Sequence, residues 1–299
     1  MTEPTDPIET PLVLPLAGDT LLGVLAAPAG PADATALLVV VGGPQVRVGS
    51  HRQFVQLARH LAAAGHATLR FDVRGMGDSS GSPAGFEHLH EDIAAAVDAL
   101  FAARPEVRRV VLWGLCDGAS AALLYLHKTR DPRIGGLVLL NPWVRSPQTL
   151  ARATLRHYYL QRLRQPGFWR KLLGGSVGAD AARGWWQNFQ TARQRVRQAR
   201  DAESPSSGAP FSARMAQAWR AFQGPILLVL SGDDVTAHEF ADHARADANW
   251  RGALDIPRVT RADLPGADHT FSGPDSGPQV LALTLDWLRQ ERAASTPDR

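Results

Sequence analysis

Apolar and polar positions divide the chain into short segments of two kinds. Segments of strand length occur at residues 36–41, 68–71, 109–113, 136–141, 225–230 and 257–264. Several are uninterrupted apolar runs, which are typical of strands buried on both faces of a sheet. Residues 11–16 and 20–26 are joined by an Ala-Gly-Asp turn and predict a leading β-hairpin.

Apolar residues at helical spacing separate these segments. Residues 52–64 place Phe54, Leu57 and Leu61 on one face, and Gly65 is suited to end that helix. Further helices are expected at residues 88–102, 117–126 and 278–289. Strands that alternate with helices predict an α/β fold, in which a mostly parallel central sheet is covered by helices on both faces.

The alternation is interrupted between residues 142 and 223. This stretch has helical patterning and no convincing strand, and it lies between two core strands. The simplest interpretation is a helical cap, or lid, at residues 142–223 inserted into a core formed by residues 1–141 and 224–299.

The expected cap has its own charge and composition. It contains fourteen Lys and Arg against three acidic residues, a surplus of eleven positive charges, whereas the whole chain is +3, so the remainder is −8. Such a cap could hold an anionic or sugar-bearing substrate or rest against anionic lipid or polymer. The alternative is a solvated helix face with aromatic residues packed inward. Five of the eight Trp lie in this stretch, namely Trp143, Trp169, Trp185, Trp186 and Trp219.

Composition excludes several other classes of protein. No apolar run reaches about 18 residues, so no transmembrane helix is expected, and the acidic N-terminus lacks the basic region of a signal peptide. The single Cys excludes an internal disulfide, which makes a cytoplasmic protein the default expectation. Nucleic-acid binding needs a docking element as well as charge, and none is present.

Candidate chemistry begins with the stretch 110–122, which predicts a strand, a Gly-x-Cys-x-Gly turn and a helix. At such a turn the middle residue, here Cys116, adopts a strained conformation, and Gly114 and Gly118 leave room for close packing. The N-terminus of the following helix is expected to lower the pKa of the thiol. The alternative is that Cys116 is a small buried hydrophobic residue, but its place between strand and helix favours a nucleophile.

A thiol nucleophile needs a base and a group that orients the base. His269 follows the last strand and precedes the last helix, so its loop can reach the turn at Cys116. The orienting carboxylate should follow the strand at 225–230, where Asp234 is preferred and Asp233 is the alternative. Four other histidines lie on or beside expected helices and are interpreted as surface groups, namely His51, His60, His88 and His238.

Stabilisation of an oxyanion requires two backbone N–H donors already in place. One should be the N–H of Asp117, directly after the nucleophile. The other should come from the loop after residues 36–41, where Pro44 has no N–H, so Gly43 is preferred and Gln45 is the alternative. The carboxylate of Asp117 would raise the pKa of the neighbouring thiol unless its side chain turns toward the helix N-terminus.

This arrangement resembles the α/β-hydrolase fold. The resemblance covers nearly the whole chain and rests on five ordered motifs: the Gly42-Gly43-Pro44 loop, the Asp72-x-Arg74-Gly75-x-Gly77-x-Ser79 turn, the Gly114 to Gly118 elbow, Asp234, and Asp268-His269. Two features depart from the usual pattern. Val41 replaces the His of the oxyanion loop, and Cys116 replaces Ser, as in dienelactone hydrolases, which generally lack so large a cap.

Three stretches resemble more narrowly the exosortase A system-associated hydrolase 1 family of bacterial exopolysaccharide and protein-sorting loci. That resemblance implies a hydrolase of this genomic context without implying a known substrate. The stretches are Gly42-Gly43-Pro44-Gln45-Val46-Arg47-Val48-Gly49-Ser50-His51-Arg52-Gln53-Phe54, Leu112-Trp113-Gly114-Leu115-Cys116-Asp117 and Asn141-Pro142-Trp143-Val144-Arg145.

The sequence therefore predicts a hydrolase that cleaves carboxylic esters or thioesters of small molecules through a Cys116–His269–Asp234 triad and an acyl-enzyme. Two alternatives remain: an acyltransferase that uses the same acyl-cysteine, and a non-catalytic binding member of the fold. No cofactor or metal is expected, because neither a Gly-x-Gly-x-x-Gly unit nor a His or Cys cluster at metal spacing occurs. The sequence does not define the oligomeric state.

Overall fold

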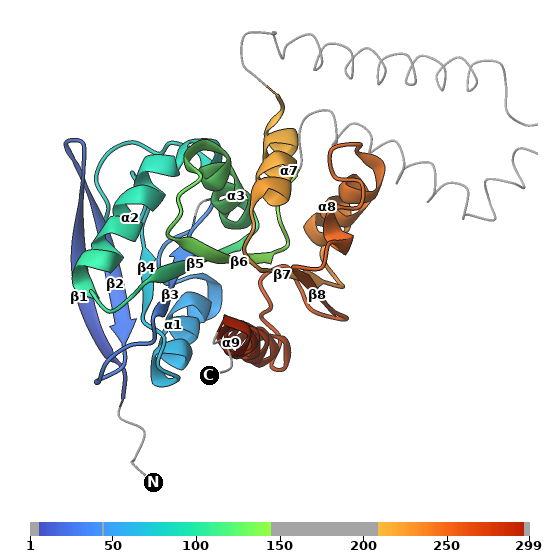
Figure 1. Cartoon of the computed structure of the whole chain (residues 1–299). Helices are drawn as coiled ribbons and strands as arrows, with labels where there is room; N and C mark the ends of the chain where they lie inside the picture. Colours follow the sequence, from blue (N-terminus) through green and yellow to red (C-terminus); the bar gives the residue numbers. More distant parts are fainter. Residues whose placement is uncertain (1–5, 44, 145–208, 296–299) are drawn as a thin grey trace, which may run out of the picture. The chain divides into compact units, whose positions relative to one another are not determined.

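The fold is built on an eight-stranded sheet whose strand order is β1-β2-β4-β3-β5-β6-β7-β8 (Figure 1). The computed structural model describes residues 6–43, 45–144 and 209–295. Strands β1 and β2 form an antiparallel hairpin, β2 pairs antiparallel with β4, and the remaining neighbours are parallel. The strands are β1 Ile8–Leu16, β2 Asp19–Ala27, β3 Thr35–Val40, β4 Thr68–Phe71, β5 Arg109–Leu115, β6 Ile134–Leu140, β7 Ile226–Ser231 and β8 Val259–Leu264.

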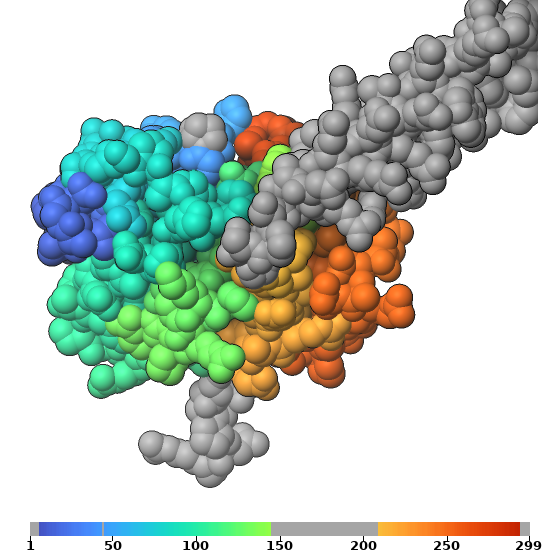
Figure 2. Space-filling view, turned by 90° about the horizontal axis from the view of Figure 1, so that it is seen from above, coloured from blue at the N-terminus to red at the C-terminus, as the bar shows by residue number. Residues whose placement is uncertain are grey.

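Helices cover both faces of this sheet. Helices α1 and α9 lie on one face and α2, α3, α7 and α8 on the other (Figure 1), where they stand side by side in Figure 2. The described helices are α1 Gln53–Ala63, α2 His90–Ala103, α3 Asp117–Thr129, α7 Phe211–Ala221, α8 Val235–Ala246 and α9 Ser276–Ser295, with short 3-10 turns η1 Ser50–Arg52, η2 Phe86–His88 and η3 Ala253–Asp255.

The predicted parallel sheet with helices on both faces is confirmed, and the strand positions agree to within a few residues. Every residue of β3, β4 and β7 is buried, as expected for strands covered on both sides. Helix α8 was not predicted as a helix, since its hydrophobic stripe is interrupted by polar residues. It begins where Asp234 accepts hydrogen bonds from the N–H groups of Thr236 and Ala237, an N-cap that directly follows β7.

Most of the predicted cap lies outside the described residues, so its insertion and its basic surface stay predictions. Helix α7 belongs to the same compact unit as the sheet, although it falls within the range expected for the cap. Its Trp219 is fully buried against Phe240 and Trp250 and donates through Nε1 to the Ala253 carbonyl at 2.7 Å. This tryptophan is therefore a core residue.

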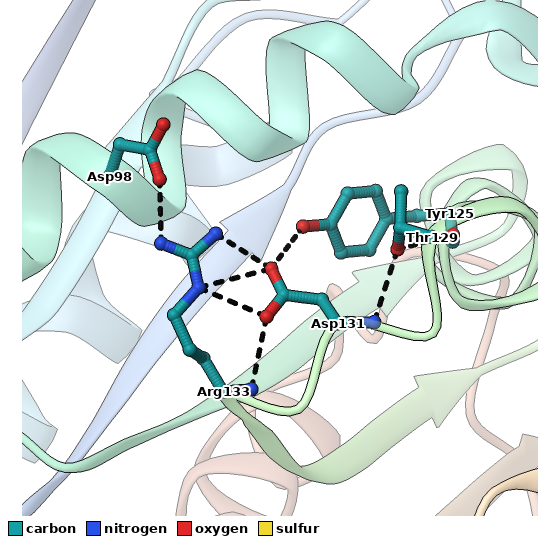
Figure 3. Close-up of polar contacts among 5 residues, drawn as sticks. All are labelled: Asp98, Tyr125, Thr129, Asp131 and Arg133. Carbon is teal, nitrogen blue, oxygen red and sulfur yellow. Dashed lines mark hydrogen bonds and ion pairs between the residues drawn. The ribbon is translucent and has the colours of Figure 1, made fainter.

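A polar network fixes the far end of α3, the helix that carries the predicted nucleophile at its start (Figure 3). Asp131 accepts a hydrogen bond from the Tyr125 hydroxyl at 2.5 Å and is paired with the Arg133 guanidinium at 2.7 Å. Arg133 reaches Asp98 of α2 at 2.6 Å, and the Thr129 hydroxyl accepts from the Asp131 N–H. The network joins α3 to the start of β6 and to α2, so α3 is held at the end opposite the elbow.

Candidate active site

The turn between β5 and α3 has the strained geometry expected of a nucleophile elbow. Cys116 adopts φ 56° and ψ −119°, a conformation that is uncommon for a residue with a side chain. A Cβ on Gly118 would lie 2.2 Å from the Val40 carbonyl oxygen, and one on Gly114 would lie 2.5 Å from the Gly118 backbone. Both glycines are thus needed for α3 to pack directly against β3 and β5.

The thiol of Cys116 is neutral at rest. Burial, and to a smaller extent the nearby Asp117 carboxylate, raise its pKa from the ordinary 9.0 to about 12. The Asp117 N–H opposes this by bonding to the sulfur, but its effect is smaller. The N–H at the helix N-terminus does lower the thiol pKa, as expected, but burial and the adjacent carboxylate outweigh it, so the pKa is raised overall.

The Asp117 side chain lies between the thiol and the glycine loop. Its Oδ1 accepts a hydrogen bond from the Cys116 Sγ at 3.7 Å, and its Oδ2 lies 3.1 Å from where a Cβ on Gly43 would be. Burial raises the pKa of this carboxyl group as well. The side chain has not turned away from the sulfur, which was the condition under which the sequence expected a reactive thiolate.

Asp234 and His269 form a hydrogen-bonded pair. Nδ1 of His269 lies 2.9 Å from Oδ2 of Asp234, and Asp234 is buried at the end of β7. The bond to Asp234 raises the pKa of His269, with smaller contributions from Asp117 and Asp268. Burial tends to raise the pKa of Asp234, but the bond to His269 and the two N-cap bonds lower it overall. Asp233, the alternative acid, is exposed.

The structure brings Cys116, Asp117, Asp234 and His269 together at the carboxyl edge of the sheet. Asp117 and Asp234 are both close enough to influence the thiol, and Asp117 also influences His269. Within the described residues, however, the hydrogen bond of the thiol goes to Asp117 and not to the imidazole. The four histidines expected at the surface are exposed, which confirms that interpretation: His51, His60, His88 and His238.

The loop that follows β3 packs closely on the elbow. A Cβ on Gly42 would lie 2.1 Å from the Gly118 nitrogen, and Gly43 has a φ of +58° that favours glycine. These contacts place the candidate donor Gly43 beside Asp117, at the start of α3. Gln45, the alternative donor, is partly buried in the same loop.

A buried carboxylate that the sequence did not single out holds the other end of this loop. Asp72 is fully buried, accepts from the Arg47 N–H at 2.6 Å and is ion-paired with the Arg47 guanidinium, which also reaches Asp78 at 2.5 Å. The Asp78 N–H donates to Asp72 as well, at 3.1 Å. The two motifs that carry these residues were recognised, but their mutual contact is visible only in the fold.

Asn141 is a second residue whose role the sequence did not reveal. It is fully buried at the end of β6, and its side-chain amide donates to the Ser231 hydroxyl and the His269 carbonyl oxygen. The one available signal was its position at the start of the Asn141-Pro142-Trp143 stretch.

Within the described ranges, no three His, Cys, Asp or Glu side chains gather as a metal site. In the same part of the chain, no helix is both long enough and apolar enough to cross a membrane. The chemistry available at the site is that of a thiol, an imidazole, carboxyl groups and backbone amides.

Residues 37–282 match the model of the alpha/beta hydrolase family, so the chain belongs to that family. This confirms the predicted α/β-hydrolase fold and the predicted enzyme class, an α/β-hydrolase. No curated protein matches the chain significantly.

Solved structures with the same fold include three hydrolases. The Pyrococcus furiosus esterase Pf2001 has 15% identity over 95% of this chain and 91% of its own, with a TM-score of 0.62. Est1E from Butyrivibrio proteoclasticus, solved with ferulic acid, has 16% identity over 94% and 99%, with a TM-score of 0.60. A dienelactone hydrolase from Anabaena variabilis has 15% identity over 95% and 98%, with a TM-score of 0.58. At these identities the likeness shows the fold alone.

Proposed function

We propose that the protein hydrolyses carboxylic esters or thioesters through a Cys116–His269–Asp234 triad. The observation that carries the proposal is the bond between His269 Nδ1 and the buried Asp234, on an edge of the sheet that also holds the strained Cys116. A carboxylate bound to Nδ1 fixes the tautomer in which Nε2 is free to accept a proton.

The reaction begins from a neutral thiol. As Sγ of Cys116 attacks the acyl carbon, its proton passes to Nε2 of His269, and a carbon–sulfur bond forms. The bond to the leaving oxygen or sulfur then breaks, and His269 returns the proton to the departing alcohol or thiol. Water next attacks the acyl-cysteine, with His269 taking its proton, and the carbon–sulfur bond breaks to release the acid and restore the thiol.

The N–H groups of Asp117 and Gly43 would bind the oxyanion formed in both steps. The first N–H groups of a helix have no carbonyl partner within it, so the Asp117 N–H, which bonds the Cys116 sulfur at rest, could bind the oxyanion when an acyl group is bound. The close approach of the Gly42-Gly43 loop to the start of α3 supports Gly43 as the second donor.

The carboxyl group of Asp117 bears on the choice of substrate. While ionised, it would repel both a thiolate and a developing oxyanion, so it must be protonated or displaced when an acyl group binds. A thiolate is also a good leaving group, and therefore esters and thioesters suit the site better than amides.

The narrower likeness to the exosortase-associated family belongs to this proposal. Under it, the enzyme would belong to an exopolysaccharide or protein-sorting locus. The basic surplus of residues 142–223 favours an anionic or sugar-bearing ester or thioester as substrate. Esterase activity in Pf2001 and ferulic acid bound to Est1E are consistent with an ester substrate.

A substrate panel tests the proposal. The parent protein is assayed against p-nitrophenyl esters and acyl-CoA thioesters from acetyl to decanoyl, alone and with a sugar alcohol as acceptor. Release of free acid supports hydrolysis, and acyl-sugar formed in place of free acid would show a transferase instead. An absence of turnover, together with failure of Cys116 to be acylated by an activated ester, would leave a binding role.

A further inference from the structure

The side chain of Asn141 connects two loops of the candidate triad. Its Nδ2 donates to the Ser231 hydroxyl at 2.6 Å and to the His269 carbonyl oxygen at 3.2 Å, and its Oδ1 accepts from the Ser231 N–H at 2.9 Å. Ser231 ends β7, three residues before Asp234. A single amide thus contacts both the loop that carries the acid and the residue that carries the base.

The backbone around Asn141 extends this connection to the nucleophile. The Asn141 N–H donates to the Val229 carbonyl at 3.1 Å, and two residues on, the Trp143 N–H donates to the Cys116 carbonyl at 3.4 Å. The Ser120 hydroxyl in the first turn of α3 donates to the Trp143 carbonyl at 2.7 Å. The segment that leaves β6 therefore touches the elbow as well.

Other bonds hold the His269 loop on either side of His269. After it, the Phe271 N–H donates to the Asp268 carbonyl at 3.2 Å and the Ser272 N–H donates to the Asp268 carboxylate at 2.8 Å. Two more lie before it. The Gly232 N–H donates to Leu264 and the Asp233 N–H donates to Ala267, at 2.9 Å and 3.0 Å. The bond from Asn141 is made to His269 itself. It restrains the peptide group of His269, from which the direction of the imidazole follows.

The conformation of Asn141 is also specialised. Its φ is +44°, and it precedes Pro142, which normally favours an extended backbone. Asparagine and glycine tolerate a positive φ better than other residues. Since the side chain is fully buried with three polar contacts, asparagine meets a backbone requirement and a hydrogen-bonding requirement together.

We propose that Asn141 is the positioning residue of this active site, holding the His269 backbone and the end of β7 so that the imidazole meets the Asp234 carboxylate and the thiol in one geometry. The inference rests on the proposed triad. Asn141 does not touch the reacting atoms. It acts through His269, and a small displacement of a catalytic group is enough to lower a rate by about 100-fold.

Two variants separate the hydrogen bonds from the backbone conformation. Asn141→Gly keeps the positive φ accessible and removes the amide, whereas Asn141→Asp keeps the shape and replaces the donor with an oxygen that faces the His269 carbonyl. Asn249→Asp is the matched control, because Asn249 is exposed and its side-chain amide donates to the nearby Asp247.

The test combines histidine NMR titration with kinetics. The pKa of His269 is measured on protein labelled with 13C-histidine, and its signal is assigned with His269→Gln. For the best ester of the panel, kcat and KM are measured, and folding is followed by urea unfolding. In the parent, three carboxylates face the imidazole, those of Asp234, Asp117 and Asp268, and the bond to Asp234 is the largest cause of its raised pKa.

Loosening the His269 loop should weaken the bond to Asp234. We expect the His269 pKa to fall in Asn141→Gly, which adds no new charge. In both Asn141 variants kcat should fall about 10- to 100-fold and KM should change less than about twofold, while Asn249→Asp behaves as the parent. An unchanged His269 pKa in folded Asn141→Gly, or a loss of activity that only tracks loss of folded protein, would overturn the proposal. If the parent hydrolyses no ester, the proposed function fails, and the NMR titration still decides the role of Asn141.

Discussion

Replacing Asp117 with Asn should make the thiol of Cys116 more reactive. The substitution removes the carboxylate charge 3.7 Å from the sulfur and retains the backbone N–H at the start of α3. Burial and Asp117 together raise the pKa of Cys116 from 9.0 to about 12. Only the second of these causes is removed, so the pKa should fall part of the way back.

The size of the effect can be worked from the geometry. Two unit charges this far apart interact by about 4 kcal/mol at an effective dielectric constant of 20. Removing the charge could therefore lower the thiol pKa by at most about three. Because burial is the larger cause and the site is partly solvated, a fall of about one is expected. The thiolate fraction at pH 8 then rises about tenfold, but intrinsic nucleophilicity decreases with pKa, so alkylation should accelerate about three- to fourfold.

The assay is the rate of carbamidomethylation by iodoacetamide at pH 8, followed by whole-protein mass. Cys116 is the only Cys in the chain, so an increase in mass by one carbamidomethyl group reports the modification of this thiol. Asp233→Asn is the control, since Asp233 is exposed beyond β7. Equal alkylation rates for Asp117→Asn and parent, with both proteins folded, would refute the electrostatic account of the thiol.

Three further substitutions test other parts of the structure. Asp234→Asn removes the main cause of the raised His269 pKa, and since the reaction needs neutral imidazole, the acid limb of the kcat/KM profile should move to lower pH while kcat falls at least about 100-fold. Gly118→Ala forces a Cβ against a backbone carbonyl at 2.2 Å and should cost at least about 2 kcal/mol in urea unfolding. Arg47→Ala leaves the buried Asp72 without its cation and should lower the free energy of unfolding by about 3 kcal/mol at neutral pH.

The glycine and arginine substitutions each have a control in the same chain. Gly30→Ala should be nearly neutral, because nothing lies within 4 Å of the new methyl group. Arg59→Ala removes a more exposed pair with Glu9 and should lower the free energy of unfolding much less than Arg47→Ala does. An acid limb that stays in place in Asp234→Asn would remove Asp234 from the triad. Glycine or arginine variants that unfold like their controls would contradict the packing at Gly118 or the role given to Arg47.

The hydrophobic pattern alone was sufficient to predict the sheet, because parallel strands such as β3 and β7 are buried on both faces and appear in the sequence as apolar runs. The elbow at Cys116 was also predictable, since the two flanking glycines and the strand-to-helix change are local features. Helix α8 was missed because polar residues interrupt its hydrophobic stripe. Its N-cap, Asp234, had moreover been assigned to the site.

Electrostatics at the site could not be read in the same way. The helix N-terminus argued for a low thiol pKa, but burial of Cys116 and the rotamer of Asp117 decide the direction, and both depend on the packed loop at Gly43. The contacts of Asn141 and Asp72 could not be predicted for a related reason. Their partners, His269 and Arg47, are distant in sequence, and only the folded chain brings them into contact.

The central claim is that Cys116 is the nucleophile of an ester-hydrolysing enzyme, and the most direct measurement compares ester turnover by the parent, Cys116→Ala and Cys116→Ser. The account predicts turnover by the parent and none above background by Cys116→Ala at unchanged urea stability. The acyl chain length at which the parent turns over fastest would then indicate the length of the acyl pocket. Equal rates for the parent and Cys116→Ala would contradict it.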